Sequence, residues 1–145
     1  MSENILEEKS YFNKKILFLV LLCIGFFGIL IRLYFAEFQI PLTGDATNYF
    51  VYAADTSLKG KFSEIYFLAN SGWSLFLSTL FSLTNLNDSL FLMNIQRVTS
   101  IVVSTATIIP LYFLCRKFLN QTFSLVGIAI FVFEPHIITN SILGV

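Results

Sequence analysis

The residue best suited to chemistry is Asp45, which closes the turn-like sequence Pro41-Leu-Thr-Gly-Asp45. This sequence follows an apolar segment long enough to cross a bilayer, so we expect the carboxylate just outside a membrane. A carboxylate at a water-accessible, partly apolar surface can deprotonate an attacking hydroxyl or amine. Asp is also a common helix N-cap, and Ala46 to Ala54 could form the helix that it caps. Two roles for Asp45 are therefore open, general base and helix cap.

The composition is that of an integral membrane protein. Hydrophobic residues make up 56% of the chain and charged residues only 12%, which is roughly half the charge of a soluble domain. The formal net charge is zero, so nucleic acid is not expected as a partner. Cys23 and Cys115 lie inside apolar runs, and the single histidine, His136, has no second His or Cys nearby. These spacings predict neither a disulfide nor a metal site.

Three apolar segments predict an all-α membrane fold. The first, 16–36, would cover about 31 Å, close to the ~30 Å of a hydrocarbon core. Arg32 lies near its far end and is expected to extend toward the lipid headgroups. The second span is 97–115, where Pro110 predicts a kink. The third, 118–145, is interrupted by the polar sequence Glu-Pro-His.

The stretch Ile65–Asn87 is uncharged but rich in hydroxyl and amide side chains, which are costly in hydrocarbon. We expect a helix that lies in the membrane interface, with Trp73 at headgroup depth. A fourth span is the alternative.

Basic residues set the expected orientation. The Lys pair at 14–15 and the Arg-Lys pair at 116–117 fit the positive-inside rule if both face the cytoplasm. Residues 1–15 would then be a cytoplasmic segment of a protein in the plasma or cytoplasmic membrane. The loop 37–96 would be external.

Several motifs of this loop and of the spans after it follow a recognisable order. In the loop they are Asp45-Ala-x-x-Tyr49, Lys59-Gly-Lys-Phe and Gly72-Trp-Ser-Leu-Phe-Leu. The second span begins with Arg97 and ends in Tyr112-x-x-x-Arg116, and the third contains Phe133-Glu-Pro-His. Together they resemble the N-terminal part of GT-C glycosyltransferases, most closely the dolichyl-phosphate-mannose protein mannosyltransferases and the undecaprenyl-phosphate aminoarabinose transferases. Those families usually have Asp-Glu at the acidic site, where this chain has Asp45-Ala46.

The resemblance implies transfer of a sugar, with inversion, from a polyprenyl-phosphate donor to a protein, lipid or glycan acceptor at the external membrane face. Asp45 would be the catalytic base, and Tyr49 and Arg97 would bind substrate, Arg97 by placing positive charge near the phosphate. The other role open to Arg97 is a helix-end anchor at the headgroups. No cofactor is implied, and a requirement for a divalent metal stays open.

Residues 16–145 would be the N-terminal part of a GT-C-like membrane domain. Enzymes of that superfamily need later helices to enclose the lipid donor, so we expect this chain to be inactive by itself. The alternative is a small non-enzymatic membrane protein, such as a polyprenyl-linked sugar flippase or an accessory subunit.

Overall fold

The computed structural model describes residues 13–61, 71–84 and 88–145, and these residues form helices joined by short loops. The helices are α1 (Lys14–Phe35), α2 (Asp45–Lys59), α3 (Ser71–Ser82), α4 (Ser89–Ala106), α5 (Ile108–Cys115), α6 (Gln121–Phe133) and α7 (Pro135–Leu143). Residues 1–12 of the predicted cytoplasmic segment and residues 62–70 and 85–87 of the predicted loop lie outside the described part. The all-helical fold class is confirmed.

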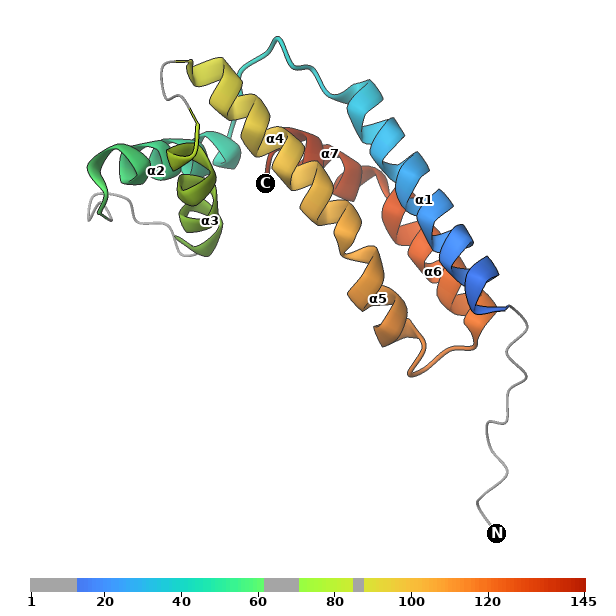
Figure 1. Ribbon diagram of the computed structural model, residues 1–145. Coiled ribbons are helices and arrows are strands. Elements are labelled where there is room, and N and C mark those ends of the chain that lie inside the picture. Colours follow the sequence, from blue (N-terminus) through green and yellow to red (C-terminus); the bar gives the residue numbers. More distant parts are fainter. Residues whose placement is uncertain (1–12, 62–70, 85–87) are drawn as a thin grey trace.

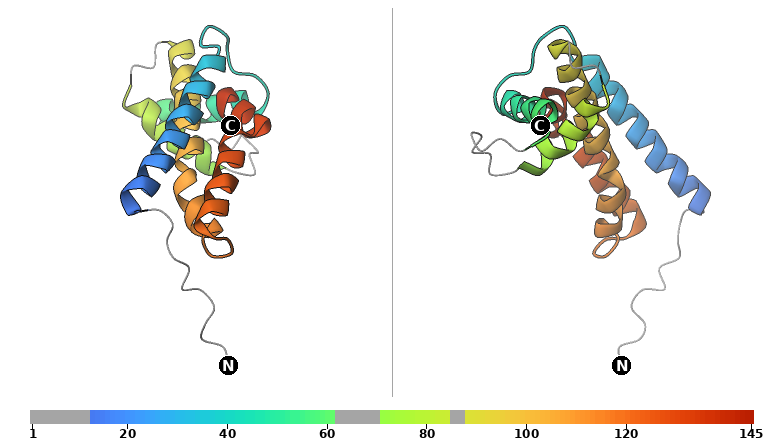
Figure 2. Two further views of the ribbon diagram at one scale, coloured as in Figure 1. Left: turned by 90° about the vertical axis from the view of Figure 1, so that its right-hand side faces the viewer. Right: turned by 60° about the vertical axis from the view of Figure 1, so that its left-hand side comes forward.

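The long helices lie together and the short ones lie at one end of them. In Figure 1, α1, α6 and the α4–α5 pair run side by side, and α2 lies to the left of α4. The right-hand view of Figure 2 shows α2 and α3 set to one side of this group. Within the described residues, α1 and the continuous α4–α5 segment are each long and apolar enough to cross a membrane. The pair α6–α7, bent by 49°, passes the same test only when its two helices are taken together, as a broken span or a re-entrant loop.

The second long helix starts earlier than expected and is interrupted close to its proline. It begins at Ser89 rather than at residue 97, because the Asp88 carboxylate caps it by accepting hydrogen bonds from the backbone N–H groups of Leu90 and Phe91. Farther along, the single residue Thr107 separates α4 from α5, three residues before Pro110. Proline has no N–H to donate to the carbonyl four residues earlier, which accounts for the interruption at Thr107, whereas a bend of the helix at this point stays a prediction.

The polar interruption of the third segment is a helix junction. α6 ends at Phe133, and the Glu134 side chain accepts a hydrogen bond of 2.8 Å from the Ile137 N–H at the start of α7. Pro135 occupies the first position of α7, where its missing N–H costs nothing. Glu134 is therefore a helix cap that fixes the bend between α6 and α7.

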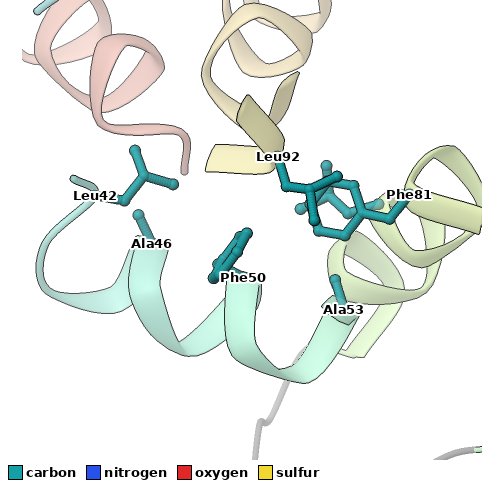
Figure 3. Close-up of a cluster of buried hydrophobic side chains, with 7 residues drawn as sticks. Leu42, Ala46, Phe50, Ala53, Phe81 and Leu92 are labelled. Atoms are coloured by element: carbon teal, nitrogen blue, oxygen red, sulfur yellow. The ribbon is translucent and has the colours of Figure 1, made fainter. Parts of the chain in front are cut away.

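Two apolar clusters hold the helices together. One lies between α2, α3 and α4 and consists of Leu42, Ala46, Phe50, Ala53, Leu77, Phe81 and Leu92 (Figure 3). The other joins α5 and α6 and is covered by side chains of α1. α3 has 12 residues, about 18 Å of helix, which is shorter than a hydrocarbon core. Its buried face packs on α2, as the Phe50–Phe81 ring contact at 5.7 Å illustrates.

Candidate functional site at the α1–α2 loop

The loop between α1 and α2 is fastened to α4. Three α4 side chains donate hydrogen bonds of 2.9–3.0 Å to backbone carbonyls here: Asn94 to Phe38, Gln96 to Ala46, and Arg97 to Ile40. Backbone carbonyls in a loop otherwise need water as a partner. The loop that leads to Asp45 is therefore held at defined points rather than left free in solvent.

Asp45 is the first residue of α2 and does not cap it. The N-cap is Gly44, whose φ of 62° and ψ of −138° suit glycine, and no side chain caps this helix end. The Thr47 hydroxyl instead closes the turn by donating to the Leu42 carbonyl at 2.8 Å. The capping role considered for Asp45 is therefore wrong. Its carboxylate is exposed, with no hydrogen bond or ion pair to any residue of the described segments.

Tyr49 lies one helical turn after Asp45. Residues four apart share a face of a helix, so the two side chains project from the same side of α2. Ala46, Phe50 and Ala53 turn into the core between α2 and α4 (Figure 3). Tyr49 is half-buried. The helix thus separates a packed face from a face that carries a carboxylate and a phenol.

Arg97 lies behind the loop, with only 4% of its surface exposed. Its Nη2 donates to the Ile40 carbonyl, its Nε to the Ile142 carbonyl at 3.0 Å, and its Nη1 to Asn94 Oδ1 at 2.6 Å. The guanidinium carbon is also 5.8 Å from the centre of the Phe38 ring. Arg97 is therefore neither a headgroup anchor nor a free cation, because its contacts join α4 to the loop and to α7. Contact with a donor phosphate stays a prediction.

The C-terminal end of α7 meets the same part of α4. The Gly144 carbonyl accepts hydrogen bonds from Gln96 at 2.9 Å and from the Trp73 indole at 3.3 Å, and the Ser100 hydroxyl donates to the Val145 carbonyl. The last carbonyls of a helix carry partial negative charge, which favours the nearby Arg97. Trp73, expected at headgroup depth, is half-buried and fastens α3 to α7. Gln96 links this end to the start of α2.

Arg32 is the polar residue whose position the sequence analysis missed. It is fully buried rather than directed toward headgroups, with Nε donating to Ser141 Oγ and Nη1 to the Gly28 carbonyl, both at 3.0 Å. Its Nη2 is buried without a partner, and no acidic side chain pairs with it within the described residues. The only available signal was the rarity of an ionisable residue in so apolar a helix.

The remaining candidates do not join this site. Lys59 forms an ion pair with Asp55, at 2.7 Å, one turn away on α2. His136 is exposed near the start of α7. Across residues 13–61, 71–84 and 88–145, no group of three His, Cys, Asp or Glu side chains is arranged to hold a metal ion.

Comparison with known proteins returns no relative. No family model matches the chain, and neither a curated protein nor a solved structure is significantly similar to it. The chemistry of the Asp45 loop therefore has to be argued from its own residues and geometry.

Proposed function

We propose that this chain is the N-terminal part of a membrane glycosyltransferase that moves a sugar from a polyprenyl-phosphate donor to a protein, lipid or glycan acceptor at the external membrane face. The observation that carries the proposal is the exposure of the Asp45 carboxylate at a fixed position. Its carboxylate is exposed and unpaired within the described residues, while the backbone around it is fastened to α4. A group that has no structural partner but a fixed position is suited to catalysis.

In this reaction Asp45 accepts the proton of an acceptor hydroxyl or amine. The acceptor atom then bonds to the anomeric carbon as the bond from that carbon to the phosphate oxygen breaks, which inverts the configuration. Tyr49, on the same face of α2, orients the acceptor. Arg97 adds positive potential behind the loop, where charge builds up on the leaving phosphate. Later helices would enclose the lipid part of the donor.

The test is a matched pair of substitutions on α2, made in the longest reading frame that contains this chain. Asp45→Asn keeps the size of the side chain and removes its basicity, so sugar transfer should fall by roughly 10²–10⁴. Asp55→Asn neutralises another acid of the same helix, one that pairs with Lys59, and transfer should stay near wild type. Wild-type turnover in Asp45→Asn would show that Asp45 is not the general base. It would favour the alternative of a flippase, which needs no external base.

The proposal also requires Asp45 to face outside. A cysteine at Asn48, an exposed α2 position, should react with an impermeant thiol reagent in intact cells. A cysteine at Thr122, exposed near the start of α6, should react only after the membrane is opened. The reverse pattern would place Asp45 in the cytoplasm and contradict the proposed reaction site.

A further inference from the structure

One side of α7 is polar and exposed, although α7 belongs to the third apolar segment. This side carries residues spaced three or four positions apart, all of them exposed, and we call them the α7 stripe: His136, Thr139, Asn140 and Leu143. The opposite side of the helix is buried, with Ser141 only 2% exposed and in contact with Arg32 of α1. α7 therefore places an imidazole, a hydroxyl and an amide on its outer surface.

The exposed surfaces of the other long helices differ from the α7 stripe. No exposed side chain carries a charge, an amide or an imidazole over residues 16–35 of α1, 91–114 of α4–α5 and 123–133 of α6. Large apolar side chains are exposed there instead, for example Phe26, Val102 and Ile130. Such surfaces suit lipid tails, whereas the polar groups of the α7 stripe do not.

α7 lies at the depth of the hydrocarbon. Counted from the start of α6 at one boundary, the 13 residues of α6 rise about 20 Å of the ~30 Å core. α7 is bent from α6 by 49°, so its 9 residues advance about 9 Å more. α1 gives the same depth, because Arg32, which donates to Ser141, lies about 27 Å along its helix from Lys14. The α7 stripe is therefore in the outer third of the membrane, on the side where Asp45 lies.

Lipid is an unfavourable neighbour for the α7 stripe. Thr139 donates to the Pro135 carbonyl of its own helix at 2.9 Å. The side chains of His136 and Asn140 have no hydrogen-bond partner among residues 13–61, 71–84 and 88–145. Amide and imidazole groups without partners are costly in hydrocarbon, and water supplies the donors and acceptors that they lack.

The end of α7 lies beside the start of α2, where the exposed Asp45 carboxylate meets water. Gln96 joins the two helices by donating to the Gly144 carbonyl and to the Ala46 carbonyl. Figures 1 and 2 show the C-terminus close to α2 in every view. We propose that water reaches the α7 stripe from the side of the membrane on which Asp45 lies. α7 then lines an aqueous path that descends from the Asp45 site into the outer third of the membrane.

This inference does not rest on the proposed transfer reaction, because its test is thiol labelling. Cys23 and Cys115 are replaced by alanine, and single-cysteine variants are made in the longest reading frame that contains this chain. An impermeant maleimide is applied from the side on which Asn48→Cys reacts, so the result does not depend on the orientation of the protein. The maleimide reacts with the thiolate, which forms in water and not in lipid. Thr139→Cys and Asn140→Cys should both be labelled.

The matched control is Val98→Cys. Val98 is exposed on α4 next to Arg97, whose Nε donates to the Ile142 carbonyl, so it lies at the depth of the end of α7. Val98 belongs to the apolar surface and faces lipid. A thiol pKa raised by one unit lowers the thiolate fraction tenfold, so Thr139→Cys and Asn140→Cys should be labelled at least about tenfold faster than Val98→Cys. A melting temperature near that of the wild type shows that each variant is folded.

Two results would overturn the proposal. Absence of labelling in both Thr139→Cys and Asn140→Cys would show that lipid or another helix covers the α7 stripe. Labelling of Val98→Cys as fast as theirs would show that this level of the protein lies outside the hydrocarbon, so that α7 lines no path within it.

Discussion

Replacing Arg97 by methionine should release the loop that positions Asp45. Methionine keeps much of the length and packing of the side chain but removes the donors to the Ile40 and Ile142 carbonyls, at 2.9 and 3.0 Å. Of these two acceptors only Ile40 belongs to the loop, and a hydrogen bond from a charged donor contributes about 1.5–3 kcal/mol, so this bond stabilises the closed loop by about that amount. Even the lower figure corresponds to a local opening constant raised roughly tenfold.

Hydrogen–deuterium exchange of the 36–47 peptide measures this opening directly. Two control variants should change the exchange rate of this peptide less than Arg97→Met does. Asn94→Ala removes a neutral donor to the Phe38 carbonyl and should raise exchange only about fivefold. Arg116→Met makes the same chemical change at the opposite end of the α4–α5 segment, where Nη1 of Arg116 donates to the Leu119 carbonyl, and should leave this peptide unaffected. Exchange in Arg97→Met no faster than in Arg116→Met would refute the role of Arg97 as the fastening of the loop.

Three further changes test the packing around the site. Asp88→Ala should lower the free energy of unfolding by about 0.5–2 kcal/mol because it removes a helix cap. Asp45→Ala should lower it by less than half as much, and equal losses would show that Asp45 caps α2 after all. Gly28→Ala places a Cβ 2.5 Å from a methyl group of α6 and should cost about 1–3 kcal/mol, while Gly25→Ala, 3.5 Å from its nearest neighbour, should be tolerated in thermal melts; equal melting temperatures would contradict the close approach of α1 and α6. Trp73→Phe removes the indole donor to the end of α7 and should lower the unfolding free energy by about 0.5–1.5 kcal/mol, and faster hydrogen exchange should be confined to α7.

Apolar run length and proline chemistry predicted most of the helical frame. The run at 16–36 corresponds to α1, at Lys14–Phe35, because an uninterrupted apolar sequence has few alternatives to a helix in lipid. The break before Pro110 and the junction at Glu134 were also visible, because proline acts through its own backbone whatever surrounds it. The early start of α4 was missed, although Asp88 before an apolar run is an N-cap signal.

The errors concern polar side chains whose partners are distant in sequence. Arg32 was expected at the headgroups, and a headgroup anchor was one of the two roles open to Arg97, because a charge is costly in hydrocarbon. Both are satisfied in part by acceptors on α7, more than forty residues further along the chain. Likewise, the composition around Asp45 permitted a cap, and only the backbone conformation of Gly44 shows that the helix starts without one. A local sequence pattern predicts neither a hydrogen-bond partner that is distant in the chain nor the backbone conformation at the start of a helix.

The most direct test of the proposed function is the single-turnover rate of transfer by protein saturated with donor, because this isolates the transfer step from donor binding. In the full reading frame, Asp45→Asn should slow this step by roughly 10²–10⁴ while donor affinity stays unchanged. Transfer within about threefold of wild type would contradict a general base at Asp45, since positioned proton transfer contributes far more than that.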